Sequence, residues 1–198
     1  CEMCIRDRLW AAYVAFFGVG SVGRVLRHGA LAARKRDAQG RSAATTAAWA
    51  AFVLALPLVH WYAVRRYVLA VAHASPRGAL SLYDVAGAAL VLGGIALNAW
   101  AARHLGVAYD RVVAPAALVT SGPYAWVQHP IYTSYMLLFA GFCMALRSAP
   151  CAVLLLLVCA AYYGLRTQLE AGVLSKAFRE KYAAYVQRTP WRFVPRIA

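Results

Sequence analysis

Hydrophobic and polar positions divide this chain into long apolar blocks joined by short polar or basic connections. A helix needs about 20 mostly apolar residues to cross a bilayer, and a shorter block can span by extending into its flanking residues. We therefore predict five spanning helices, which cover approximately residues 9–26, 47–64, 82–102, 131–146 and 151–165.

The last two blocks are separated only by residues 147–150, so they should form an antiparallel helical hairpin. Beyond them, apolar residues recur at three- and four-residue spacings with charges between them, which predicts an amphipathic helix in the C-terminal tail. Pro190 and Pro195 should end that helix, and Trp191 suits a membrane interface.

The composition supports a membrane protein. Hydrophobic residues reach 63% and charged residues only 14%, against about 45–50% and about 25% in ordinary globular chains. We predict a single all-α integral membrane domain over residues 1–198, with N-terminal transmembrane helices in 1–105 and the functional half in 106–198. The net charge of +14 sits between apolar blocks, where it favours contacts with anionic lipids and gives no reason to expect a nucleic-acid partner.

Lysine and arginine are concentrated in the connections 27–41 and 103–111 and in the tail 166–196. The positive-inside rule then places the N-terminus outside and the C-terminus in the cytosol. The polar run at 103–130 and the basic tail would share the cytosolic face.

The polar run ends in "SGPYAWVQHPIY" (121–132), where the prolines restrict or break a helix. Irregular backbone at a membrane surface persists where protein buries it or where it lines a polar cavity. Its Tyr124, Gln128, His129 and Tyr132 indicate either a pocket for a ligand with polar and flat apolar parts, or a re-entrant loop with tyrosines at the headgroup level.

Arg166 and Glu170 lie four residues apart where the fifth predicted helix leaves the membrane, so they share a helix face. They could form a simple surface ion pair. Alternatively, the arginine offers a fork for a carboxylate and the glutamate an acceptor for an ammonium, which suits a zwitterion or two oppositely charged ligands.

Other chemistries lack their motifs. The histidines have no partner at metal-ligand spacing, and the chain has only seven acidic residues, so we expect no metal site. Ser121 is not in a GxSxG elbow, and the glycines of "GVGSVG" (18–23) follow no strand.

"LVTSGPYAWVQHPIY" (118–132) and "RTQLEAGVLSKAFREKYAAYVQRTP" (166–190) resemble the C-terminal half of the isoprenylcysteine carboxyl methyltransferase family, within the wider phospholipid methyltransferase group. The resemblance covers the chain from Tyr109 onwards and implies a membrane-embedded methyltransferase that uses S-adenosylmethionine. It implies that Arg166 orients the methyl acceptor and that Glu170 holds the amino group of the cofactor. The other cofactor-binding positions that it implies are Tyr109, Ala116, Ala117, Leu118, Val119, Tyr124, His129, Pro130, Ile131 and Tyr132.

Two positions depart from the family pattern. Gln128 stands where an arginine is usual before His-Pro, and Ala171 stands where a second glutamate is usual. The first removes a charge, and the second leaves Glu170 as the only acid of the motif.

Methyl transfer from a sulfonium requires mainly alignment and exclusion of water. A carboxylate acceptor needs no general base, whereas an ammonium must first lose a proton. The scarcity of acids therefore favours a carboxylate or thiolate acceptor, and together with the resemblance it predicts carboxyl methylation of an isoprenylcysteine-like lipophilic substrate. The alternatives are N-methylation of a phospholipid amine, S-methylation of a small thiol, an NADPH enzyme similar to sterol reductases, and a non-enzymatic membrane adaptor.

Overall fold

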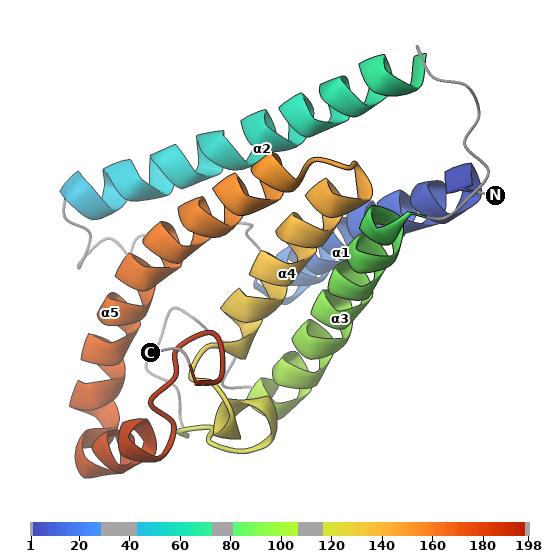
Figure 1. The fold of residues 1–198 in the computed structure, drawn as a ribbon. Coiled ribbons are helices and arrows are strands. Elements are labelled where there is room, and N and C mark those ends of the chain that lie inside the picture. Colours follow the sequence, from blue (N-terminus) through green and yellow to red (C-terminus); the bar gives the residue numbers. More distant parts are fainter. Residues whose placement is uncertain (1, 29–42, 73–80, 107–116, 197–198) are drawn as a thin grey trace.

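The computed structural model describes residues 2–28, 43–72, 81–106 and 117–196. In these ranges the elements are helical: α1 (Glu2–His28), α2 (Ala43–Ala72), α3 (Leu82–Leu105), a short 3-10 helix η3 (Gly122–Ala125), α4 (Pro130–Ala145) and α5 (Ala149–Arg188). The predicted all-α class is confirmed. α4 lies between α3 and α5, with α2 beside α5 (Figure 1).

Three of the described helices, α2, α3 and α5, are long and apolar enough to cross a membrane, which is consistent with a multi-pass membrane protein. α4 is apolar but has only 16 residues, because His129-Pro130 sets its start and a turn follows Ala145. α1 carries charged residues in its first turns and is not one of the three spans. Membrane crossing by α1 and α4 therefore stays a prediction.

The α4–α5 hairpin is confirmed, with its turn at residues 146–148. Arg147 adopts a positive φ of 55° in this turn, and its Nη2 lies 3.2 Å from the buried carboxylate of Asp84 at the start of α3. Asp84 also completes a capping box with Ser81. The ion pair thus connects the hairpin turn to one end of α3, and His129 lies at the other end of the α3–α4 pair.

α5 combines two elements that the sequence pattern predicts separately, the fifth apolar helix and the amphipathic tail helix. It bends at Arg179, whose φ of 44° is left-handed, and the chain beyond turns across the end of the bundle (Figure 1). Of the predicted apolar face, Tyr182 and Tyr185 are buried, whereas Val173 is 50% exposed. The last turns of α5 therefore pack against the protein, and the part before the bend leaves apolar side chains exposed.

Glycines allow α3 and α4 to pack closely. A Cβ added at Gly87 would lie 2.6 Å from the backbone nitrogen of Ala145, and one at Gly94 would lie 2.9 Å from Cγ of Leu138. A Cβ at the adjacent Gly93 would meet no heavy atom within 4 Å. Small residues at such an interface let two membrane helices approach backbone to backbone.

We expect Gly87→Ala to destabilise the protein by about 1–3 kcal/mol, because the new methyl group collides with backbone that cannot rotate away. Gly93→Ala is the matched control, and it should stabilise by about 0.5–1 kcal/mol because alanine is the better helix former. Thermal unfolding of both variants in detergent micelles measures the difference. Equal melting temperatures would show that the α3–α4 contact does not depend on the glycine.

Candidate functional site

The loop before α4 places His129 at the end of the bundle. Pro123 is the second residue of η3, and Pro130 occupies the first turn of α4, where its missing N–H costs no helical hydrogen bond. His129 is therefore the N-cap residue, with φ −130° and ψ 61°, and its carbonyl accepts from the N–H groups of Tyr132 and Thr133. This local geometry puts the imidazole and the Tyr132 side chain at the open end of the α4–α5 hairpin, away from its turn.

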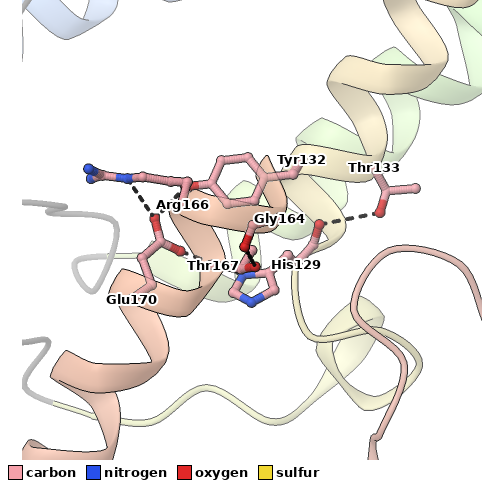
Figure 2. Close-up of polar contacts among 7 residues, drawn as sticks. All are labelled: His129, Tyr132, Thr133, Gly164, Arg166, Thr167 and Glu170. Atoms are coloured by element: carbon pink, nitrogen blue, oxygen red, sulfur yellow. Dashed lines mark hydrogen bonds and ion pairs between the residues drawn. The ribbon is translucent and has the colours of Figure 1, made fainter. Parts of the chain in front are cut away.

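Glu170 is the centre of a polar cluster that joins α4 and α5 (Figure 2). Its Oε1 accepts a short hydrogen bond from the Tyr132 hydroxyl and a second one, at 3.3 Å, from Nε of Arg166. Its Oε2 lies 3.6 Å from Nδ1 of His129. Glu170 and Arg166 are half-buried, with side chains 29% and 23% exposed, so water only partly screens the charges.

Aromatic rings form one wall of this cluster. Tyr132 stacks on Tyr163 with ring centroids 4.5 Å apart and planes 15° from parallel, and the His129 ring lies 5.6 Å from that of Tyr132. Tyr163 in turn contacts Phe52 of α2. These ring contacts therefore extend from the polar cluster to the interface between α2 and α5.

His129 is largely buried, and burial lowers its pKa below the ordinary value for histidine. The nearby carboxylate of Glu170 acts in the opposite direction, and the positive charge of Arg192 lowers the pKa again. A lowered pKa favours the neutral imidazole, in which one nitrogen donates and the other accepts.

Residues 189–193, which follow α5, lie along the His129 loop; we call them the C-terminal strap. The backbone N–H groups of Gln128 and His129 donate to the carbonyls of Trp191 and Arg192, at 2.9 and 3.0 Å. The hydroxyl of Tyr185 donates to the carbonyl of Tyr124 at 2.8 Å. The C-terminal end of the chain thus holds the loop that carries the histidine.

The structure brings together four of the sequence-predicted residues: His129, Tyr132, Arg166 and Glu170. Tyr124, Ile131 and Val119 pack instead in a second cluster against Ala101 of α3. Pro130 is buried at the start of α4, Leu118 is half-buried and Ala117 is exposed. Tyr109 and Ala116 lie outside the described residues.

Sequence reasoning missed Tyr163 and the strap. The register of the predicted hairpin could have found Tyr163, which lies about as far after the turn as Tyr132 lies before it and stacks on that ring. Within the strap, Pro190 predicts the end of a helix and Trp191 suits a membrane interface, but neither shows where the following chain lies.

The side chains of the cluster can bind particular chemical groups. A half-buried carboxylate surrounded by donors can accept from an ammonium, and a guanidinium fork beside it can bind a carboxylate. Flat aromatic faces favour a ring or a sulfonium cation. The site thus suits a zwitterionic ligand with an aromatic part, next to a second, anionic ligand.

Comparison with known families agrees with this chemistry. The family model described as phospholipid methyltransferase matches residues 82–181, which include α3, α4 and the Arg166–Glu170 pair. The match covers half of the chain, and this chain therefore belongs to the phospholipid methyltransferase family. Methyltransferases of this family use S-adenosylmethionine. No curated protein matches the chain.

Proposed function

We propose, from membership of the phospholipid methyltransferase family, that this chain transfers a methyl group from S-adenosylmethionine to a lipophilic acceptor at the membrane. The observation that carries the proposal is the position of Glu170, whose carboxylate is shared by Tyr132 and Arg166 and lies beside His129. The acceptor that we favour is the carboxylate of an isoprenylcysteine-like substrate.

The residues present fit the cofactor. Glu170 would hold its amino group, and the stacked rings of His129, Tyr132 and Tyr163 would line its apolar parts. When bound, S-adenosylmethionine supplies a methyl group on a positively charged sulfur. The chain contributes alignment and exclusion of water, which strengthens the interaction of Glu170 with a cation.

Arg166 supports the carboxylate acceptor. Its Nε donates to Glu170, and the outer nitrogens of its guanidinium point away from His129 (Figure 2). A carboxylate bound to that fork is already ionised and needs no base, so Arg166 has only to orient it. The positive-inside rule places this end of the bundle in the cytosol, where the cofactor is made, and the acceptor would enter from the lipid.

A phospholipid amine is the second candidate, and two observations favour it. The matching family model is described as phospholipid methyltransferase, and burial lowers the pKa of His129, which favours the neutral imidazole that can accept a proton. An ammonium acceptor must lose a proton before its nitrogen can attack, so this route would use His129 as a base.

Calorimetric titration of the purified protein tests the proposal. S-adenosylhomocysteine, the demethylated cofactor, should bind to the protein in lipid nanodiscs, and NADPH should not. Incubation with radiolabelled cofactor and membrane extract then identifies the acceptor, because methyl esters are hydrolysed by base and N-methyl products are stable. Binding of NADPH without binding of S-adenosylhomocysteine would favour a reductase and rule out the proposed function.

A further inference from the structure

The side chain of Gln128 points toward the C-terminal strap rather than toward the Glu170 cluster. Its Nε2 lies 2.8 Å from the carbonyl oxygen of Thr189 and 3.3 Å from that of Pro190. Its backbone N–H donates to Trp191. We infer that Gln128 is a positioning residue, which holds the strap against the loop and thereby keeps His129 in place for the reaction.

The hydrogen bonds define what position 128 must supply. Backbone carbonyls only accept, so a side chain that binds two of them must donate, and the glutamine amide provides two N–H groups. An arginine provides donors as well, whereas a glutamate of the same shape provides none and repels both carbonyls. The glutamine found where relatives are expected to have arginine thus preserves the donor, and it does not indicate a different substrate.

The strap acts on both sides of the histidine. The His129 N–H donates to Arg192, and the Thr133 hydroxyl donates to the carbonyl of Phe193 at 2.7 Å. The Phe193 ring lies 6.2 Å from the imidazole. Thr189 contributes a further bond to the carbonyl of Ala125 at 3.4 Å. If the hydrogen bonds from Gln128 to residues 189 and 190 are lost, the strap is held less firmly. The Arg192 carbonyl that accepts from the His129 N–H then also becomes less fixed.

Three variants test this inference. Gln128→Glu removes the donors, Gln128→Arg restores donors with a different shape, and Gln187→Glu makes the same chemical change at an exposed position of α5. Hydrogen exchange of the His129 amide reports on the strap directly, because that amide is hydrogen-bonded to Arg192. Affinity for S-adenosylhomocysteine reports on the site, and this second measurement rests on the proposed function.

In Gln128→Glu we expect exchange of the His129 amide to accelerate about tenfold and cofactor affinity to fall about tenfold, the effect of losing a typical hydrogen bond. Gln128→Arg and Gln187→Glu should stay within about twofold of the wild type in both measurements. Gln128→Met lacks the donors but adds no charge, so it should behave like Gln128→Glu. If the glutamate variant does not fold, the methionine variant tests the role of the donors.

Two outcomes would overturn the inference. One is wild-type exchange of the His129 amide in both Gln128→Glu and Gln128→Met. The other is loss of affinity in Gln128→Arg with a fully protected amide, which would place position 128 in direct contact with a ligand. Failure of the proposed function gives a different result. The wild type itself would not bind S-adenosylhomocysteine, but the His129 amide would still exchange faster in the variants that lack a donor at position 128.

Discussion

Glu170→Gln is expected to weaken binding of S-adenosylhomocysteine by about 10- to 100-fold, because a hydrogen bond to a charged group contributes about 1.5–3 kcal/mol. The substitution keeps the shape of the side chain but replaces one acceptor oxygen by an amide that repels an ammonium. Tyr132 and Arg166 lose the charge that they now share. Calorimetry in nanodiscs measures the loss.

Glu180→Gln is the matched control, since Glu180 lies on the same helix and is exposed. Its affinity should equal that of the wild type. A cofactor analogue with hydrogen in place of the amino group sharpens the test. It should bind the wild type more weakly than S-adenosylhomocysteine does. On Glu170→Gln, the analogue and S-adenosylhomocysteine should bind with equal affinity. Additive losses in this double cycle would show that Glu170 does not bind the amino group.

The hairpin and the polar cluster could be predicted from sequence because each depends on local signals. The connection at 147–150 is too short for anything but antiparallel neighbours, and His129-Pro130 begins a helix by the chemistry of proline. Together these place Tyr132 opposite Tyr163, with Arg166 and Glu170 on the next two turns of α5. The hydroxyl of Tyr132 then reaches Glu170 farther along that helix.

The strap could not be predicted because its contacts use backbone carbonyls of residues 189–193, which any sequence possesses. The bend at Arg179 is similar, since a left-handed φ usually favours glycine and the sequence has arginine there. Tertiary contacts of Tyr182 and Tyr185 with the end of the bundle determine where the chain turns. Gln128 lies beside the strap because the bend at Arg179 and the packing of Tyr182 and Tyr185 bring residues 189–193 to it.

The geometry of the cluster also bears on the alternative of a non-enzymatic adaptor. An i,i+4 ion pair on a helix surface contributes about 0.3–0.5 kcal/mol and needs no third group. Here Tyr132 and His129 approach the same carboxylate from a second element, and neither is required to stabilise a surface pair. Such convergence of two elements on one half-buried acid agrees with the ligand site that we propose, and the family match supports an enzyme.

Arg166→Met is expected to lower turnover by about 100-fold, the typical effect of misplacing a reacting group by about 1 Å, and to leave affinity for S-adenosylhomocysteine nearly unchanged. Affinity persists because Glu170 keeps its contact with Tyr132 and its proximity to His129. Arg188→Met, on the exposed end of the same helix, is the matched control and should retain full activity.

The size of the Arg166 effect separates the two acceptors. A carboxylate is attracted to the guanidinium, so Arg166→Met should raise the KM for an isoprenylcysteine-like acid, and Arg166→Lys should restore part of the loss through charge alone. The ammonium of a phospholipid is repelled by the same group while its phosphate is attracted, so its turnover should change much less in Arg166→Met than that of a carboxylate. N-methylation that is nearly as fast in Arg166→Met as in the wild type would therefore refute the carboxylate assignment and leave the cofactor site intact.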